Sequence, residues 1–240
     1  MQAVIPSAAA PQAGRRLDVH GLFATPLAQG RIDNAAKVNG ELSRAILEHE
    51  RTTPGRRVSI AGGWQSDIDF PRWSGPAGEH LLATLLSAVR SMTRIRPGMN
   101  YAPNWRVFAW ANVIRRGHFN HPHIHPGNFW SAVYYVDDGG PAGPDSGGEI
   151  EFYDPRGAAP AMYNPFVAAA TPDGEAGGAS VKIAPTAGAF LIFPSYLRHA
   201  VNPYRGDATR ISVAVNFALN DAEAESGLAW PGPRADFAAI

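Results

Sequence analysis

The chain has 240 residues, a formal net charge of zero and a sequence pI near 7.1. This balance gives no electrostatic basis for nucleic acid or an anionic membrane as the main partner. Because cysteine is absent, disulfides and thiolate metal sites are excluded, and any metal ion must be held by His, Asp or Glu side chains.

The N-terminal part of the chain predicts a mobile lead followed by two helices. Residues 1–16 are rich in Ala, Pro and Gln and lack the pattern of a signal peptide, and no apolar run is long enough to span a bilayer. We therefore expect a disordered lead and a cytoplasmic protein. Apolar residues at helical spacing predict helices over about 34–51 and 76–95, with Asn34 and Ser74 as candidate N-caps.

The rest of the chain reads as strands. Short apolar or alternating runs, separated by Gly, Pro and Asp, occur at 105–115, 130–136, 149–153, 180–183, 189–193 and 209–217. Residues 154–180, rich in Ala, Gly and Pro, predict a long inserted loop of the kind that often covers a substrate. Two helices followed by many short strands predict a mainly β protein, a sandwich or jelly roll with flanking helices.

Four of the eight histidines lie within residues 118–125. In extended backbone the side chains at positions i and i+2 point to the same face, so His121, His123 and His125 could all face one way. Two imidazoles at this spacing can bind one metal ion. Pro122 and Pro126 cannot donate to a β-ladder, which places the segment at a strand end or edge. A solvated His-rich turn without a specific role is the alternative interpretation.

The distal half of the chain contains His199, and after it residues of two kinds alternate along the sequence. Ile211, Val213, Val215 and Phe217 fall on one face, whereas Arg210, Ser212, Ala214 and Asn216 fall on the other. The first face predicts a core, and the second suits the inside of a ligand-holding barrel. An arginine inside a barrel needs an anion, and a dicarboxylate cosubstrate would supply a carboxylate that the guanidinium binds through two bonds. Ser212 could add a hydroxyl to the same oxygens.

These segments resemble a known family. Asn112 to Gly117, His123 to Pro126, Trp130 to Val136, Gly147 to Arg156, Pro185 to Gly188, His199 to Val201 and Arg210 to Ser212 are together similar to the Fe(II)/2-oxoglutarate oxygenases of the prolyl-hydroxylase-like branch. The resemblance covers about residues 20–218. It implies a double-stranded β-helix buttressed by the two N-terminal helices. The implied domain spans 17–220, with a helical part at 34–95, a β-helix core at 104–218 and an irregular tail at 221–240.

Carried over by position, the resemblance implies a site that holds Fe(II). His123, His125 and His199 would bind the metal, and Arg210 with Ser212 would bind the distal carboxylate of 2-oxoglutarate. Asn112 on a neighbouring strand could contact the cosubstrate. His125 stands where most of the superfamily has Asp or Glu, which departs from the usual two-His, one-carboxylate set. The resemblance favours the 123/125 pair and leaves His121 at the rim.

The implied activity is a hydroxylation of a C–H bond that uses O₂ and 2-oxoglutarate and yields succinate and CO₂. The substrate would be a small molecule or a peptide side chain, with neither nucleic acid nor membrane as partner, and a homodimer is compatible with the exposed edges. One alternative is a cupin-like three-His metalloenzyme without 2-oxoglutarate, which would not need Arg210. Another is a non-enzymatic ligand-binding jelly roll with an aromatic platform formed by Trp64, Trp73, Trp105, Trp110 and Trp130.

Overall fold

The computed structural model of the chain is described here for residues 24–140, 146–157, 166–167, 169–171, 174–176 and 179–219. The predicted lead at 1–16 and the tail at 221–240 lie outside these residues. The elements in chain order are β1 (Ala28–Arg31), α1 (Ala35–Thr52), β2 (Ile60–Ala61), β3 (Trp64–Gln65), α2 (Phe70–Trp73), α3 (Gly75–Met92), β4 (Trp105–Ile114), β5 (Phe119–His123), β6 (Trp130–Asp137), β7 (Ile150–Tyr153), β8 (Ala169–Thr171), β9 (Gly174–Ala176), β10 (Ser180–Ile183), β11 (Ala189–Pro194), β12 (His199–Val201) and β13 (Arg210–Leu219). In the described part of the chain, no helix is long and apolar enough to cross a membrane.

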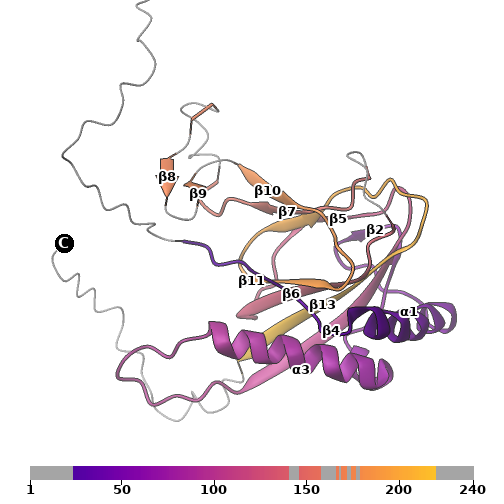
Figure 1. Cartoon of the computed structure of the whole chain (residues 1–240), viewed down its shortest axis with the longest axis horizontal. Helices are drawn as coiled ribbons and strands as arrows, with labels where there is room; N and C mark the ends of the chain where they lie inside the picture. The colour runs from indigo at the N-terminus through magenta and orange to yellow at the C-terminus, as the bar shows by residue number, and fades with distance from the viewer. Residues whose placement is uncertain are drawn as a thin grey trace, which may run out of the picture.

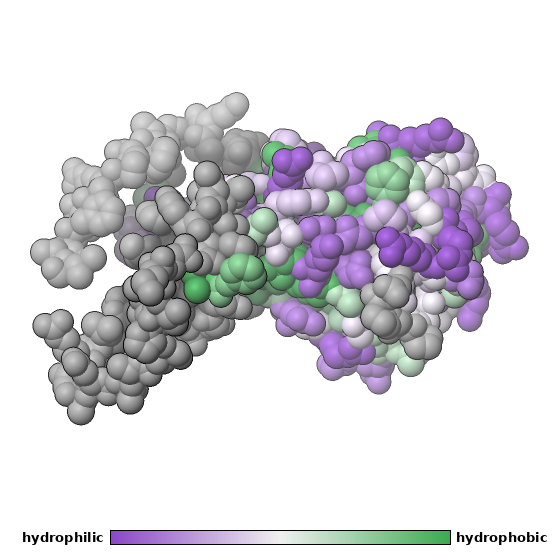
Figure 2. All heavy atoms as spheres, turned by 90° about the horizontal axis from the view of Figure 1, so that it is seen from above, coloured by the Kyte–Doolittle hydropathy of each residue, from purple (hydrophilic) through white to green (hydrophobic). Residues whose placement is uncertain are grey.

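Two antiparallel sheets form the body of the protein. The larger sheet has the order β1-β11-β6-β13-β4-β3, and the smaller has the order β10-β7-β12-β5-β2. Helices α1 and α3 lie along the outer side of the larger sheet, and the smaller sheet lies on its other side (Figure 1). The face seen from above carries mixed hydrophilic and hydrophobic side chains (Figure 2). The predicted mainly β fold with two buttressing N-terminal helices is confirmed.

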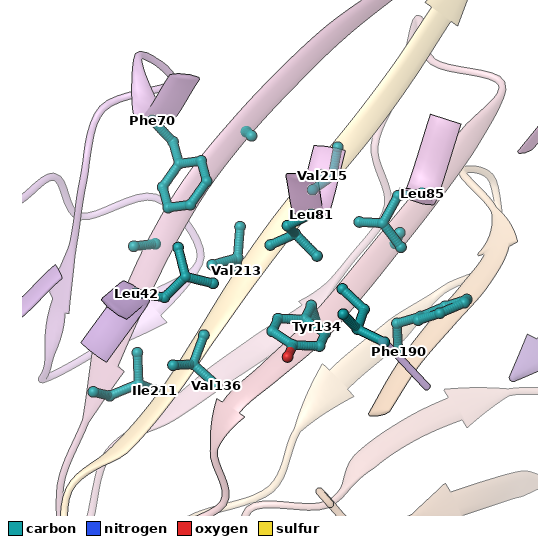
Figure 3. Packing of buried hydrophobic residues seen from close by; sticks show 14 of the residues in the cluster. Leu42, Phe70, Leu81, Leu85, Tyr134, Val136, Phe190, Ile211, Val213 and Val215 are labelled. Carbon is teal, nitrogen blue, oxygen red and sulfur yellow. The ribbon is translucent and has the colours of Figure 1, made fainter. Parts of the chain in front are cut away.

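The main core lies between the helices and the larger sheet. The stripe predicted for the second helix is buried there, with Leu81 and Leu85 fully inaccessible to solvent. They face Val213, Val215 and Tyr134 across the interface (Figure 3). Burial of such aliphatic side chains stabilises a fold by about 1.5–3 kcal/mol each. The predicted helix positions are confirmed to within a few residues.

The alternation predicted for residues 210–217 is also confirmed. The apolar face of β13 joins the core under the helices, whereas Arg210, Ser212, Ala214 and Asn216 line the cavity between the two sheets. A second apolar cluster closes one side of this space and consists of Tyr135, Ile150, Phe152, Leu191, Phe193 and Leu197. Successive side chains of β13 therefore point alternately into the core and into the cavity.

Three features differ from the sequence-based expectations. Asn34 and Ser74 occupy the predicted N-cap positions, but neither makes a side-chain cap hydrogen bond, and Asn34 has a left-handed backbone with φ of 54°. The helical part also holds β2 and β3, which pair with β5 and β4. The predicted inserted loop contains the β8–β9 hairpin, while residues 158–165, 168, 172–173 and 177–178 lie outside the described residues.

Candidate metal and cosubstrate site

Three histidines meet at the edge of the cavity between the two sheets. His123 ends β5 and His199 begins β12, and the two residues are register partners in the antiparallel pair. His125 lies two residues beyond β5, where its backbone N–H donates to the carbonyl of Ser195 at 3.0 Å. One potential ligand nitrogen from each ring lies within 4.8 Å of the others. Within the described part of the chain, this is the one such group of three or more His, Asp or Glu side chains.

His121 stands apart from this group. Between Asn120 and His123 strand β5 advances three residues, whereas its partner β12 advances two from Val201 to His199. The extra residue makes a bulge, which breaks the i, i+2 alternation that would keep His121 on the same face as His123. His121 is exposed, and its ring packs edge-on against Phe119 at 4.9 Å. The structure thus brings together His123 and His125, the pair favoured by the resemblance, and leaves His121 outside the group.

The two strand histidines are oriented by backbone carbonyls. Nδ1 of His123 lies 2.7 Å from the carbonyl oxygen of His121, and Nδ1 of His199 lies 2.8 Å from that of Leu197. A carbonyl only accepts, so both Nδ1 atoms carry a hydrogen and both Nε2 atoms keep a free lone pair. This arrangement is typical of metal-bound histidine.

Burial keeps the three rings neutral. Desolvation lowers the pKa of His123, and it lowers the pKa of His125 to about 4, where the neighbouring His123 adds to the effect. Burial likewise lowers the pKa of His199 to about 3, again with a contribution from His123. Neutral imidazole is the form that binds a metal ion, so near neutral pH no proton has to leave these rings before a metal ion binds.

Arg210 lines the same cavity and is 2% exposed. Among the described residues no carboxylate forms an ion pair with it, although Asp138 and Glu149 act on it from a longer range. Desolvation lowers its pKa from the ordinary value, but a guanidinium stays protonated in a protein. Its Nε has no hydrogen-bond partner. A buried cation without an anion is costly unless a ligand supplies one.

Tyr135 faces this arginine and was missed by the sequence analysis as a site residue. The guanidinium carbon of Arg210 lies 5.2 Å from the centre of the Tyr135 ring, and the buried Tyr135 hydroxyl has no hydrogen-bond partner. Burial raises the pKa of Tyr135 to about 12, so the hydroxyl keeps its proton and can donate. The Nε–H of Arg210 and the hydroxyl of Tyr135 are therefore two neighbouring donors without an acceptor.

Gly148 permits the close approach of the chain over Arg210. Its φ is +77°, and a Cβ atom there would lie 3.1 Å from the Tyr204 ring and 3.4 Å from Cδ of Arg210. Larger residues are therefore disfavoured both by backbone conformation and by space. The Gly147-Gly148 pair quoted for the family resemblance has a physical role in packing around the arginine.

The two remaining predicted cosubstrate residues also line the cavity. Ser212 is buried, and β13 pairs it with both Asn112 on β4 and Tyr135 on β6. The Asn112 amide oxygen lies 3.1 Å from the side-chain amide of Gln65 on β3. With its oxygen turned toward Trp110, Gln65 accepts a hydrogen bond from the indole N–H at 3.0 Å. Gln65 was not predicted as a site residue.

The cavity itself has a volume of about 370 Å³. This size suits a small cosubstrate and one reacting group rather than a large ligand. The charged residues among its lining are Arg56 and Arg210, and Arg56 is paired with Asp67 at 2.7 Å. The exposed apolar side chains of Val58, Ile68 and Ile124 contribute to the lining.

The tryptophans in the described part of the chain do not form a common platform. Trp64 and Trp130 are buried in the core, Trp73 and Trp105 pack against that core, and Trp110 lines the cavity. Their placement is that of packing residues, with Trp110 as the exception. This arrangement gives no support to an aromatic ligand-binding surface.

The geometry defines a class of protein: a jelly roll in which three histidines that could hold a metal ion and a buried cation line one shared cavity. Residues 108–216 match a family model described as "Putative 2OG-Fe(II) oxygenase". This stretch contains the three histidines as well as Arg210 and Ser212. The resemblance to the Fe(II)/2-oxoglutarate oxygenases predicted from the sequence is thereby confirmed for this stretch. No curated protein matches the chain significantly.

Solved structures share the fold at low sequence identity. A prolyl-4-hydroxylase from Pseudomonas putida is 19% identical, with a TM-score of 0.56 over 82% of this chain and 94% of that one. A prolyl hydroxylase from Trichoplax adhaerens, in complex with a peptide fragment of the hypoxia inducible factor oxygen degradation domain, is 18% identical, with a TM-score of 0.57 over 84% and 87%. The non-heme α-ketoglutarate-dependent epimerase SnoN from nogalamycin biosynthesis is 12% identical, with a TM-score of 0.52 over 80% and 76%.

Proposed function

We propose that this protein is an Fe(II)- and 2-oxoglutarate-dependent oxygenase that hydroxylates a C–H bond of a small molecule or a peptide side chain. O₂ would be the oxidant, with succinate and CO₂ as coproducts. The observation that carries the proposal is the buried Arg210, which has no ion-pair partner among the described residues and lines the same cavity as the three histidines. A metal site alone would not require it.

The donor set fits the proposed metal ion. His123, His125 and His199 would each present one neutral nitrogen, and imidazole is a suitable ligand for Fe(II). When bound, iron and 2-oxoglutarate supply the oxidising chemistry. Three neutral ligands leave the metal centre more positive than two histidines and a carboxylate do, which favours the binding of an anionic keto acid.

The donor set at the other end fits the distal carboxylate of 2-oxoglutarate. Arg210 offers a charge and the unpartnered Nε–H, Tyr135 offers a hydroxyl, and Ser212 is the register partner of Tyr135, two residues from Arg210 on the same strand. Charge-assisted hydrogen bonds of this kind are worth about 1.5–3 kcal/mol. A dicarboxylate held here would have its keto-acid end free to face the histidines.

The protein's own part in the reaction is orientation and exclusion of water. Trp110 and Ala214 contribute to the lining, and the apolar cluster with Phe193 closes another side. No carboxylate lines the cavity among the described residues, so no side chain in it is suited to act as a strong general base at neutral pH. The cofactor chemistry, positioned by these side chains, carries the reaction.

The substrate is proposed only as a class. A neighbour of similar fold was solved with a peptide, and another neighbour is an epimerase, so the fold is compatible with more than one substrate and outcome. The apolar side chains of Val58, Ile68 and Ile124 and the absence of a lining carboxylate favour an uncharged substrate group over a cationic one.

The test is an anaerobic titration of 2-oxoglutarate into protein loaded with one equivalent of Fe(II), followed by the visible metal-to-keto-acid charge-transfer band. We expect a saturable band in the wild type and at least a 30-fold weaker affinity in Arg210→Ala, which corresponds to a loss of about 2 kcal/mol. Arg205→Ala is the matched control, since Arg205 is exposed on the preceding loop. Iron binding without a band would favour a three-His enzyme that does not use 2-oxoglutarate.

A further inference from the structure

His125 differs from the other two histidines in what its second nitrogen contacts. The Nδ1 atoms of His123 and His199 face backbone carbonyls, whereas Nδ1 of His125 lies 3.3 Å from the side-chain amide nitrogen of Asn216. A carbonyl fixes the tautomer by itself. An amide presents either a donor or an acceptor, depending on how it is turned.

Asn216 belongs to a buried row of polar side chains behind His125. Ser131 Oγ donates to Oδ1 of Asn216 at 2.7 Å and lies 2.9 Å from Oγ of Ser195. Asn216 is 7% exposed and the two serines are 1% exposed each. The row crosses the sheet, because β13 and β6 pair Asn216 with Ser131, and Ser195 directly follows β11. Buried polar groups of this kind cost stability unless each finds a partner.

Ser195 is also attached to the main chain of His125. Its carbonyl accepts from the His125 backbone N–H at 3.0 Å, and its own N–H donates to the carbonyl of Phe129 at 3.1 Å. The loop that carries His125 is thus held at its backbone and, through Asn216, at its ring. His125 lies outside regular strand structure, so these contacts replace the strand pairing that holds His123 and His199.

The two orientations of the Asn216 amide have opposite consequences for a metal ion. With its nitrogen toward His125, the amide donates to Nδ1, and the neutral ring then carries its hydrogen on Nε2. That tautomer cannot offer the Nε2 lone pair to a metal. With the amide reversed, Oδ1 accepts from Nδ1–H, and Nε2 is free. The serine hydroxyls both donate and accept, so the row of hydrogen bonds can run in either direction.

We propose that Asn216 is a positioning residue for the metal site. Its amide oxygen accepts the Nδ1 hydrogen of His125 in the metal-bound protein and so presents Nε2 to the metal, while Ser131 and Ser195 hold the amide in place. The inference rests on the proposed function, because it takes His125 as a ligand. The inference goes beyond the proposed function because it assigns the orientation of the third ligand, His125, to residues that do not touch the metal.

The test measures Zn²⁺ affinity by calorimetry in four proteins: the wild type, Asn216→Asp, Asn216→Leu and Ser131→Ala. An Asp carboxylate can only accept, so Asn216→Asp is expected to bind within about threefold of the wild type or more tightly. A Leu side chain of similar size cannot accept, and loss of an outer contact to a ligand typically weakens metal binding about 10–100-fold. Ser131→Ala leaves Asn216 in place without its partner and is expected to weaken binding several-fold, which keeps the test valid if Asn216→Leu does not fold.

A second readout separates positioning from a merely structural role. In ¹⁵N-histidine-labelled, Zn²⁺-loaded protein, the His125 signal is expected to show a protonated Nδ1 and a metal-bound Nε2 in the wild type and in Asn216→Asp. Equal metal affinity in the wild type and Asn216→Leu, or an equal loss in Asn216→Asp and Asn216→Leu, would overturn the inference. A wild type that binds no metal would instead overturn the proposed function, and the inference with it.

Discussion

Arg210 and Tyr135 face each other across the buried end of the cavity, with the guanidinium carbon 5.2 Å from the centre of the phenol ring. Neither Nε of Arg210 nor the hydroxyl of Tyr135 has a hydrogen-bond partner. An unsatisfied buried polar group costs about 1–3 kcal/mol, and a bound carboxylate would remove this cost for both. In the free protein these unsatisfied groups therefore lower the stability of the fold, and a bound anion would satisfy both of them.

Replacement of Tyr135 by Phe should lower the affinity for 2-oxoglutarate without lowering the stability of the protein. We expect affinity for 2-oxoglutarate to fall about tenfold, because one donor to the carboxylate is lost. The cosubstrate-free protein should keep its melting temperature or gain a few degrees, because a buried unsatisfied hydroxyl is removed. Calorimetric titration and thermal unfolding measure the two effects.

Tyr134→Phe is the matched control, because the adjacent tyrosine points to the opposite face of β6 and donates to Asn39 on α1. This variant should lose stability and keep its affinity for 2-oxoglutarate. The reverse pattern, with affinity lost in Tyr134→Phe and kept in Tyr135→Phe, would contradict the placement of the site.

Removal of any one of the three cavity histidines should weaken metal binding, whereas removal of His121 should not. His123→Ala, His125→Ala and His199→Ala are each expected to weaken Fe(II) affinity at least 100-fold, since each removes one of the three proposed protein ligands. His121→Ala should bind as the wild type does, because the bulge in β5 turns that ring away. Anaerobic Fe(II) titration checks this, and a metal-binding defect in His121→Ala equal to that of His123→Ala would show that the ligand frame is wrong.

The stability of the metal-free protein should depend on pH in the range set by these histidines. In the unfolded chain a histidine has a pKa near 6.5, whereas burial lowers the pKa of His125 to about 4 and that of His199 to about 3. Between about pH 4 and 6.5 the unfolded state therefore binds more protons. The free energy of unfolding should fall as the pH falls through this window, by at most about 1.4 kcal/mol per pH unit for each histidine.

Chemical denaturation at pH 7, 6 and 5.5 measures this slope above the range where most carboxylates titrate. His199→Gln should flatten the dependence, whereas His121→Gln, which removes an exposed ring, should leave it unchanged. An unfolding free energy that stays constant from pH 7 to 5.5 in the wild type would contradict the account of the buried neutral triad.

Gly148→Ala should damage the cosubstrate site as well as the fold. The positive φ of +77° costs a non-glycine residue about 1–2 kcal/mol, and the added Cβ would press on Tyr204 and Arg210. Gly117→Ala is the control, because its φ of +85° brings a similar backbone cost while nothing lies within 4 Å of the added atom. Both variants should lose stability, but only Gly148→Ala should weaken 2-oxoglutarate binding, and equal affinities in the two would argue against a role of Gly148 at the arginine.

The elements predicted most reliably from the sequence are those whose apolar residues repeat with a fixed period. The alternation over 210–217 separates core from cavity residues because every second side chain of a strand shares a face, and β13 is regular and paired on both sides. The apolar stripes of α1 and α3 were found for the same reason. Two-residue strands such as β2 and β3 have no period to read, and only the folded sheets show them.

The parts of the site that were missed depend on contacts between distant segments. Tyr134 and Tyr135 are equivalent in the sequence, and only the position of Arg210 distinguishes the one that lines the cavity. The alternation places Asn216 on the cavity face, but its approach to His125 depends on a loop held by Ser195. The exclusion of His121 depends on a bulge that no spacing rule predicted.

The central claim is that Arg210 binds the distal carboxylate of 2-oxoglutarate in front of a metal held by three histidines. The most direct measurement compares 2-oxoglutarate with 2-oxopentanoate, which has the same carbon chain without the distal carboxylate, in Fe(II)-loaded wild type and Arg210→Ala under anaerobic conditions. The account predicts that the wild type binds 2-oxoglutarate at least 30-fold more tightly than 2-oxopentanoate, and that this preference disappears in Arg210→Ala. The same preference in both proteins, or none in the wild type, would contradict it.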